Sequence, residues 1–324
     1  MKLNLKSLAL ALTITLTSGY AFADNEIVIY TNADEEAQLA IKNALNAHGY
    51  EGQYLMQSMG TSELGGKLIA EGKNIEADLI TLSTYYLESL QKNNNLFKKI
   101  EFKVDPIEQL SSEYYVPMLG LTGSIFVNTE VLEADNLKVP SSISELANEE
   151  YKGHISIPDI TGSSTAWLLT QAAIEAYGDE KGSALIRKIE ENATDHLEMS
   201  GSAPLKKLRA GEAAIGFGLR HQAVADKKNG LPIDYIDPIE GNFQLREGVA
   251  IIDKGANTNP KAMEMAECII KNARQELLQN YPVALYKGET IDPELIPSNP
   301  KQFSKPLTVE LLKEHQALVK GTNN

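Results

Sequence analysis

Short polar loops follow apolar strands at five places in this 324-residue chain, and each loop opens a helix. The strands are short runs such as residues 26–30 and 78–82, whereas the helices carry apolar residues at helical spacing, as in residues 37–48. Strands that alternate with helices in this way predict a mainly parallel sheet covered by helices on both faces. The expected fold class is therefore α/β. The five loops are residues 31–34, 60–62, 161–165, 200–202 and 218–221.

The size and charge of the chain limit the number of domains and the kinds of partner that we expect. A length of 324 residues suits about two domains. No Pro/Gly/Ser-rich linker divides the sequence, so we expect the chain to cross between two domains more than once. The formal net charge of −14 disfavours nucleic acid as a partner, because an acidic surface repels phosphates. The single cysteine, Cys268, excludes an internal disulfide framework and a cysteine-based metal cluster.

Residues 1–23 have the pattern of a secretory signal. Two lysines precede a short apolar stretch, and Ala21-Phe22-Ala23 is a small-x-small cleavage pattern. The apolar stretch is shorter than the ~20 residues that span a bilayer. We expect cleavage after Ala23 and a mature protein that is free in a bacterial periplasm. A buried N-terminal helix is the alternative interpretation.

The five loops are rich in groups that bind anions. In parallel α/β sheets such loops gather beyond the carboxyl ends of the strands, where ligands bind. The free N–H groups of helix N-termini attract carboxylate, sulfate, phosphate or phosphonate, and Ser and Thr hydroxyls add neutral donors. The repetition favours an anion site over the alternative that each residue only caps its helix. The hydroxyl candidates are Thr61, Ser62, Ser163, Ser164, Thr165 and Ser202.

Charged and aromatic residues near the loops are candidates for the rest of a polar ligand. Arg220 and His221 lie where a strand passes into a helix, and an arginine there either grips two oxygens of an anion or pairs with a nearby acid. One of the acids in or beside the loops is a candidate for an ammonium group of the ligand, with helix capping or solvated charge as the alternative. These acids are Asp34, Glu35, Glu36 and Asp159. Tyr30 and Tyr115 are candidates for the same cation, with half-buried core positions as the alternative.

The sequence does not match several more specific motifs of enzymes and cofactor-binding proteins. Residues 60–67 depart from a phosphate-binding P-loop in their glycine spacing, and Leu68 stands where Ser or Thr would hold magnesium. The third glycine of a dinucleotide fingerprint is replaced by His221, and the five histidines form no metal-binding pair. No Gly-x-Ser-x-Gly nucleophile elbow is present. We expect no cofactor, no metal and no catalysis.

Several segments together resemble the solute-binding proteins of ABC importers, in the branch that contains ferric-iron and 2-aminoethylphosphonate binders. The resemblance covers essentially the whole mature chain. It rests on residues 28–32, 60–62, 77–79, 151–159, 162–167 and 209–216. It implies a two-lobed periplasmic binding protein of type II, in which each lobe is a mainly parallel sheet flanked by helices and the ligand cleft lies between the lobes. Residues 24–117 and 250–324 would form lobe 1, and residues 118–249 would form lobe 2.

The resemblance also bears on the ligand. In the iron binders of this branch a pair of tyrosines follows the segment that corresponds to residues 209–216. Here Arg220 and His221 stand in that stretch without a tyrosine, and Fe³⁺ prefers anionic oxygens. Residues 60–67 and 162–167 are most similar to the 2-aminoethylphosphonate members. The implied phosphonate ligands are Thr61, Ser62, Ser163, Ser164, Thr165 and Arg220, with His221 and Ser202 as further choices, and the implied amine ligand is Asp159, Tyr30 or Tyr115.

The expected role is capture of a small molecule rather than its conversion. Ligand binding favours a closed form of the two lobes, and the membrane subunits of the importer then recognise that form. We expect the protein to act as a monomer. The alternatives are a binder of ferric iron, a binder of a polyamine or thiamine-type cation with acids and aromatics in the cleft, and an exported enzyme that acts on a small phosphorylated substrate with His221 as its base.

Overall fold

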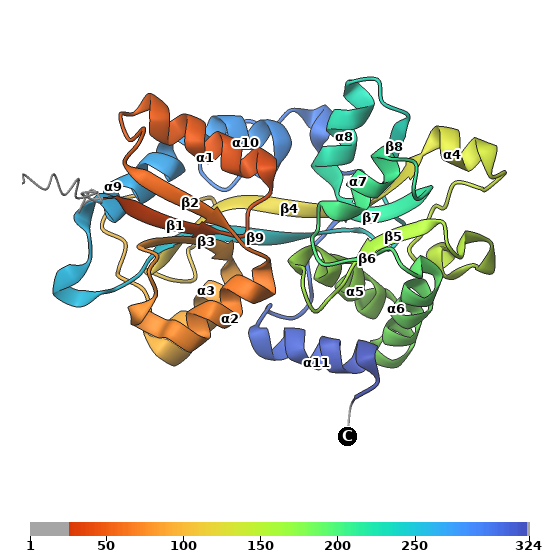
Figure 1. Cartoon of the computed structure of the whole chain (residues 1–324), viewed down its shortest axis with the longest axis horizontal. Helices are drawn as coiled ribbons and strands as arrows, with labels where there is room; N and C mark the ends of the chain where they lie inside the picture. The colour runs from red at the N-terminus through yellow and green to blue at the C-terminus, as the bar shows by residue number, and fades with distance from the viewer. Residues whose placement is uncertain (1–25, 323–324) are drawn as a thin grey trace, which may run out of the picture.

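The computed structural model describes residues 26–322, which form an α/β protein of two lobes joined by long strands (Figure 1). The predicted α/β two-lobed fold class is confirmed. The expected signal segment, residues 1–23, lies outside the described residues. Within residues 26–322, every helix is too short or too polar to cross a membrane.

The described part of the chain contains ten strands, which form one sheet. They are β1 (Ile27–Thr31), β2 (Tyr54–Ser58), β3 (Leu79–Ser83), β4 (Tyr115–Asn128), β5 (Ile155–Pro158), β6 (Leu197–Glu198), β7 (Ile215–Leu219), β8 (Ile233–Ile236), β9 (Asn242–Ile251) and β10 (Pro300–Lys301). The order is β2-β1-β3-β9-β4-β7-β5-β6, with β10 paired to β9 and β8 paired to β4. All residues of β3 and β7 are buried, as expected for strands covered by helices on both faces.

The two long strands β4 and β9 cross from one lobe to the other. Tyr115 pairs with Ala250 and Thr122 with Gln244 in one antiparallel ladder, after which β4 continues into pairings with β7 and β8. The strand pairs β1–β2, β1–β3, β5–β6 and β5–β7 are parallel. The expected parallel arrangement is therefore found inside the lobes, whereas the crossing strands pair antiparallel with each other and with β3, β7 and β8.

Helices cover both faces of the sheet in each lobe. They are α1 (Glu35–Ala47), α2 (Thr61–Glu71), α3 (Thr84–Asn94), α4 (Thr129–Ala134), α5 (Ser164–Tyr177), α6 (Asp179–Ala193), α7 (Ala203–Arg209), α8 (Arg220–Lys228), α9 (Pro260–Cys268), α10 (Arg274–Asn280) and α11 (Val309–Lys320). In lobe 1, α1 and α10 lie on one face and α2 and α3 on the other (Figure 1). In lobe 2, α7 and α8 lie opposite α5 and α6 (Figure 1).

Apolar residues form three core clusters in the described part of the chain. One cluster packs Ile41 and Leu45 of α1 with Ile27 and Ile29 of β1 inside lobe 1. A second cluster includes residues of both lobes, and there Tyr85 of α3 meets Trp167 of α5 with ring centroids 4.9 Å apart. Burial of a large apolar side chain contributes about 1.5–3 kcal/mol. The lobes therefore share an apolar contact in addition to the strands that cross between them.

The C-terminal stretch packs on lobe 2, although the expected division assigns residues 250–324 to lobe 1. The indole N–H of Trp167 donates to Nδ1 of His315 in α11 at 3.1 Å, and Arg187 of α6 donates to the carbonyl of Leu318 at 2.6 Å. Before α11, the backbone N–H of Ser298 donates to Asp237 at 2.8 Å. Because α11 covers the apolar surface of α5 and α6, the contacts favour placing residues from about 293 onward with lobe 2. The other expected boundaries stay a prediction.

Candidate functional site

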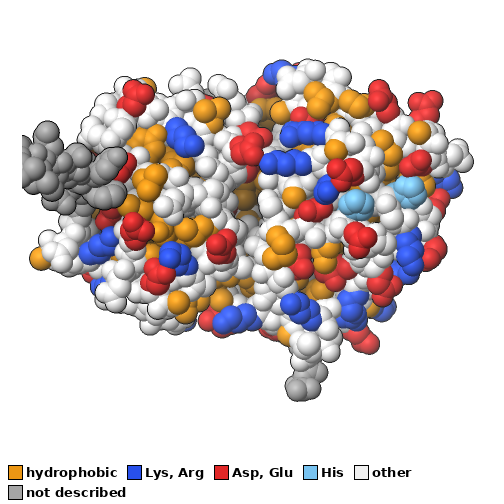
Figure 2. Space-filling model, in the orientation of Figure 1, with side chains coloured by type: hydrophobic (Ala, Val, Ile, Leu, Met, Phe, Trp, Pro, Cys, Tyr) orange, Lys and Arg blue, Asp and Glu red, His pale blue; other side chains and the backbone are white. Residues whose placement is uncertain are grey.

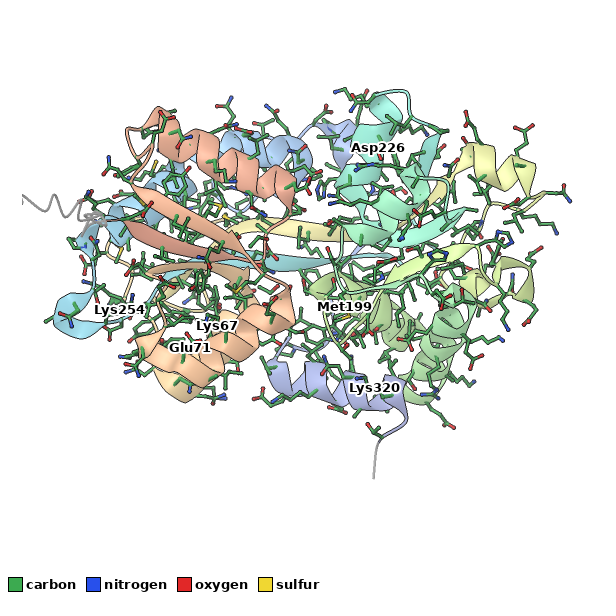
Figure 3. All side chains as sticks on the ribbon, in the orientation of Figure 1. Lys67, Glu71, Met199, Asp226, Lys254 and Lys320 are labelled. Atoms are coloured by element: carbon green, nitrogen blue, oxygen red, sulfur yellow. The ribbon has the colours of Figure 1, made fainter. Side chains whose placement is uncertain are left out.

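A pocket of about 360 Å³ lies between the lobes, and both lobes line it. Lobe 1 contributes the N-terminal ends of α1 and α2, and lobe 2 contributes the N-terminal end of α5 and the loop before α7. The space-filling view is hollowed between the two halves of the molecule (Figure 2). Met199, labelled in Figure 3, lines the lobe 2 side of this pocket and is 61% exposed, so it lies at the rim.

Hydroxyl groups from the two lobes meet in this pocket. Oγ1 of Thr61, the first residue of α2, lies 3.2 Å from Oγ of Ser164, the first residue of α5. Ser163 caps α5 by accepting a hydrogen bond from the backbone N–H of Thr165 at 3.2 Å. These four residues, all predicted from sequence, line the pocket together. The N-terminus of the 14-residue helix α5 adds free N–H groups and a partial positive charge there.

The other predicted hydroxyl residues have separate positions. Ser202 lines the pocket, and its Oγ lies 3.1 Å from Oγ of Ser200. Ser62 is not one of the residues that line the pocket, although its backbone N–H donates to the carbonyl of Gly162 at 3.4 Å across the lobes. This backbone contact and the Thr61–Ser164 contact hold the rims of the two lobes together.

A glycine lets the loop before α7 approach α5 closely. A Cβ added to Gly201 would lie 2.0 Å from Oγ1 of Thr165 and 3.2 Å from Oγ of Ser163. Any side chain at this position would therefore displace the pocket hydroxyls. The absence of a side chain at Gly201 therefore allows the predicted polar loop, Ser200 to Ser202, to lie in the pocket.

Carboxylates and an amide form the opposite end of the pocket. Asn32 follows β1 and donates from Nδ2 to Oγ1 of Thr61 at 3.0 Å and to Oε1 of Glu247 at 2.7 Å. Glu247 lies on the crossing strand β9 and is 2% exposed. Burial raises the pKa of Glu247 to about 8, and the negative charge of Asp34 adds to the shift. At neutral pH the carboxyl of Glu247 is therefore mostly protonated in the unliganded protein.

Asp34 is the second buried carboxylate of the pocket, with a side chain that is 7% exposed. Its Oδ1 caps α1 by accepting from the backbone N–H of Ala37, and it also accepts from the hydroxyl of Tyr281. Burial alone would raise the pKa of Asp34, but the imidazole of His221 and the hydroxyl of Tyr281 hold it below its usual value. Asp34 is therefore ionised in the closed pocket at neutral pH.

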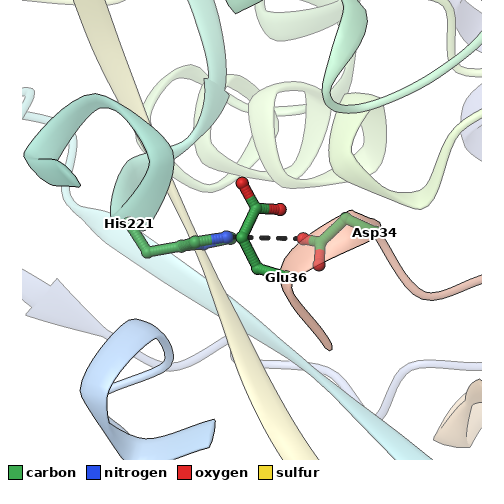
Figure 4. A group of neighbouring side chains, drawn as sticks. All are labelled: Asp34, Glu36 and His221. Atoms are coloured by element: carbon green, nitrogen blue, oxygen red, sulfur yellow. Dashed lines mark ion pairs between the residues drawn. The ribbon is translucent and has the colours of Figure 1, made fainter. Parts of the chain in front are cut away.

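Asp34, Glu36 and His221 form a group that joins the lobes (Figure 4). Nε2 of His221 lies 3.4 Å from Oδ2 of Asp34, and Nε2 of Gln222 donates to both oxygens of Glu36 at 3.0 and 3.2 Å. One ligand atom of each member of the group lies within 4.8 Å of the others. The structure thus brings together a set of metal-type ligands that the sequence analysis did not predict. His221, predicted to contact the ligand, lies beside the pocket behind Asp34 rather than on its lining.

Arg220 is not brought into the pocket. Its guanidinium donates to both oxygens of Asp237, at 2.7 and 3.1 Å, and to the carbonyl of Leu295 at 2.7 Å. Burial alone would raise the pKa of Asp237, but the hydrogen bonds from Arg220 and Ser298 hold it below its usual value. In the structure Arg220 pairs with an acid, which is the second of the two interpretations. Asp237 and the segment at Leu295 enclose its side chain.

The three amine ligands implied by the family resemblance also lie outside the pocket lining. They are Tyr30, Tyr115 and Asp159. The hydroxyl of Tyr30 donates to Glu76 at 3.1 Å, and that of Tyr115 donates to Glu88 at 2.9 Å. The carboxylate of Asp159 accepts from the backbone N–H of Thr161 at 2.6 Å, which is the capping role given as the alternative. Each of these polar atoms is engaged in its own lobe.

The pocket lining is acidic. Lys206 is the one Lys or Arg that lines it in the described chain, and Lys206 pairs with Glu35 at 2.9 Å. The carboxylates that line it are Asp34, Glu35, Glu63 and Glu247. A ligand in this pocket therefore meets donors at the hydroxyl end and acceptors at the acidic end.

A second hollow, of about 730 Å³, lies between α8 and α10. Its buried arginines are paired: Arg274 donates to both oxygens of Glu289 at 2.7 and 2.8 Å, and Arg220 is held by Asp237. Although this hollow is larger, the unpaired acceptors and the meeting of hydroxyls from both lobes lie in the smaller pocket, which we take as the functional site.

Three residues of the site were missed by the sequence analysis as ligand contacts: Asn32, Glu247 and Tyr281. Asp34 was one of the acids expected to receive an ammonium group. Asn32 and Asp34 lie in the first of the predicted loops, so that loop carried the signal. Glu247 belongs to an alternating series of positions of β9 with Phe243, Leu245, Val249 and Ile251, and an acid in such an apolar series indicates a buried functional charge. Tyr281 follows α10 and has no local signal in the sequence.

The fold and the pocket define a class of protein, the two-lobed binding proteins that close around a small solute. The family model of bacterial extracellular solute-binding proteins matches residues 77–284, and this chain belongs to that family. Its expected role as a solute-binding protein of the ABC-importer type, found in the periplasm, agrees with this family.

Three proteins to which this chain is similar carry the names of different solutes. The Fe(3+)-binding periplasmic protein of Serratia marcescens is 25% identical over 350 residues, which cover 97% of this chain and 99% of the relative. The structure of AfuA from Actinobacillus pleuropneumoniae with fructose-6-phosphate bound has a TM-score of 0.72 at 20% identity, covering 92% of this chain and 98% of that one. A periplasmic thiamin binding protein has a TM-score of 0.74 at 16% identity, covering 91% and 94%. Their names give three different solutes, and the two structural likenesses show the fold alone.

Proposed function

We propose that the protein captures a small zwitterion with a phosphonate group, 2-aminoethylphosphonate, and delivers it to the membrane subunits of an ABC importer. The observation that carries the proposal is the meeting of Thr61 and Ser164, hydroxyls from opposite lobes, in one pocket at the first residues of two helices. An anionic group bound there accepts from both lobes at once. Its binding then favours the closed form over the open form, because only the closed form offers both sets of donors.

The charges of the pocket support a zwitterion rather than a simple anion. Lys206 is paired with Glu35, and Arg220 is paired with Asp237 outside the pocket, so no free side-chain cation of the described residues offsets a dianion. A free phosphate or sulfate would also meet the charge of Asp34 at short range. A ligand that carries its own positive group removes this repulsion.

A second candidate, a ferric ion, is favoured by the group Asp34, Glu36 and His221 and by the Fe(3+)-binding relative. Fe³⁺ prefers several anionic oxygens. Here Gln222 donates to both oxygens of Glu36, and Tyr281 donates to Asp34. These bonds would have to break before the carboxylates could surround a metal ion, which is why we rank iron second.

Calorimetry with a panel of ligands tests the proposal. The protein without residues 1–23 is unfolded, dialysed and refolded to remove copurified solute, and then titrated with 2-aminoethylphosphonate, phosphate, sulfate, ferric citrate, spermidine and thiamine. We expect micromolar or tighter binding of the aminophosphonate and far weaker binding of phosphate. Tight binding of iron or of thiamine without binding of the aminophosphonate would contradict the proposal. Proton NMR of the bound ligand over hours should show no new product, whereas turnover would favour an enzyme.

A pair of variants links the binding to the hydroxyls. Ser164→Ala should weaken binding of the aminophosphonate at least tenfold, because a hydrogen bond to a charged group is worth about 1.5–3 kcal/mol. Thr170→Ala is the matched control, since Thr170 is buried in the same helix and its hydroxyl donates to the carbonyl of Ala166 at 3.0 Å. Equal losses in the two variants would point to the helix, and not to the ligand, as the partner of Ser164.

A further inference from the structure

We propose that Asn32, Asp34 and Glu247 form a subsite that binds a primary ammonium group, at the end of the pocket beside the crossing strands. The inference rests on the proposed function for the anionic half of the ligand and adds the residues that recognise its cationic half. Of the acids offered for the ammonium group from sequence it keeps Asp34, and it replaces the amine ligands implied by the resemblance, Tyr30, Tyr115 and Asp159, which lie outside the pocket lining.

The first argument is a surplus of acceptors. Both hydrogen bonds of the Asn32 side chain use Nδ2, so its Oδ1 is buried without a donor. Oδ2 of Asp34 is also buried, in a side chain that is 7% exposed, and it accepts no hydrogen bond, because its contact with Nε2 of His221 is an ion pair at 3.4 Å. Glu247 adds a further carboxyl on the same lining. Buried acceptors are almost always paired, and an ammonium group brings three donors and a positive charge.

The second argument is the continuity between the two ends of the pocket. Ser164 contacts Thr61, Asn32 donates to Thr61, and the same amide donates to Glu247. The hydroxyl end and the acidic end are therefore separated by a single side chain. A ligand that reaches both ends has its anion and its ammonium a short spacer apart, as two methylene groups provide.

The chemistry of the subsite selects among cations. A quaternary ammonium offers no N–H donor and is usually held by several aromatic faces, whereas Tyr281 is the one aromatic residue on the lining of this pocket in the described chain. A bare metal ion would need the group Asp34, Glu36 and His221, to which Glu247 does not belong. The acceptor set that includes Asn32 and Glu247 suits a donor-rich primary amine.

The experiment compares ligands that differ only at the amine. The refolded protein is titrated with 2-aminoethylphosphonate, with ethylphosphonate and with the N,N,N-trimethyl derivative. We expect the two analogues to bind at least about tenfold more weakly than the amine. Binding of none of the three overturns the proposed function, whereas equal binding of the amine and ethylphosphonate overturns the subsite and leaves the anion end in place. Ferric citrate that binds tightly and competes with the amine would assign the acids to a metal instead.

Variants then assign the discrimination to the named residues. In Glu247→Gln and Asp34→Asn, binding of the amine should weaken. Binding of ethylphosphonate should not weaken, and in Asp34→Asn it should strengthen because a repelling charge is removed, so the ratio between the two ligands falls towards one. Glu76→Gln is the matched control, because Glu76 accepts from Tyr30 much as Asp34 accepts from Tyr281 but lies outside the pocket lining. Circular dichroism verifies the fold of each variant, and the ratio is read from whichever of the two pocket variants folds. An unchanged ratio in a folded pocket variant overturns the subsite.

Discussion

Glu247→Gln should make the unliganded protein more stable at alkaline pH, even though Glu247 belongs to the binding site. Burial, followed by the charge of Asp34, raises the pKa of Glu247 to about 8 from its ordinary value of 4.5. Above pH 4.5 the unfolded chain has lost this proton while the folded protein still holds it. For a carboxyl with a raised folded-state pKa, stability therefore falls as pH rises from about 4.5 to about 8, and the whole loss is present above pH 8.

The size of the effect follows from the shift. Each unit of difference in pKa between the folded and unfolded states corresponds to about 1.4 kcal/mol. Between pH 5 and pH 8 the ionisation of Glu247 should thus lower the free energy of unfolding of the wild type by up to roughly 4 kcal/mol. A glutamine has no proton to lose, and it keeps the shape of the protonated carboxyl and an acceptor. The stability difference between variant and wild type should therefore grow by this amount in favour of the variant.

Urea unfolding of both proteins, followed by circular dichroism at pH 5, 6.5 and 8 in the absence of ligand, measures this difference. Subtracting the wild type from the variant removes the other titrating groups, including Asp34 and Tyr281, which are close to Glu247 in the pocket. A difference that stays constant over this range would refute the reasoning, since Glu247 would then be ionised in the folded protein as it is in the unfolded chain. A stability difference that changes in favour of the wild type as pH rises would refute it as well.

Three further results are expected. Arg220→Ala should lower the free energy of unfolding by roughly 3 kcal/mol, because it leaves Asp237 buried without its guanidinium. The same variant should change ligand affinity by less than about threefold. Urea unfolding measures the stability and calorimetry the affinity, and a large loss of affinity at unchanged stability would place Arg220 in the binding site. Gly201→Ala should weaken ligand binding, since its Cβ would lie 2.0 Å from Oγ1 of Thr165, and unaltered calorimetry would show that the loop gives way. At pH 7, binding of the aminophosphonate should release about one proton from Glu247. The measured heat of binding should therefore depend on the ionisation enthalpy of the buffer. A heat of binding that is the same in all buffers would contradict a contact between the ammonium group and this carboxyl.

The parts of the site that could be predicted from sequence are those fixed by local structure. Thr61, Ser163, Ser164 and Thr165 stand at helix N-termini after strands, and a helix N-terminus depends mainly on the few residues around it. The meeting of these residues follows from the parallel strands, because the carboxyl ends of such strands lie at the same edge. The alternation of strands and helices was predictable from the local sequence, although α3, α6, β6 and β8 were not among the predicted elements.

The parts that could not be predicted depend on contacts between distant segments. An arginine at the end of a strand has the same local sequence whether it binds a ligand or pairs with Asp237, which is 17 residues away. The hydroxyl of Tyr30 donates to Glu76, 46 residues away. Glu247 enters the pocket because β9 crosses between the lobes beside β3 and β4, a pairing that periodicity within β9 does not define.

The packing of the C-terminal stretch on lobe 2 has a consequence for how the chain reaches its native state. Trp167 is fully buried and bonds to His315, which is 148 residues further along the chain. Contacts between such distant segments form slowly, because a long loop must close before they contribute. During synthesis, the core of lobe 2 therefore cannot be completed before residues 309–320 are available. Until they arrive, α5 exposes an apolar surface that chaperones and proteases recognise, so a fragment that ends before α11 should be degraded or aggregate.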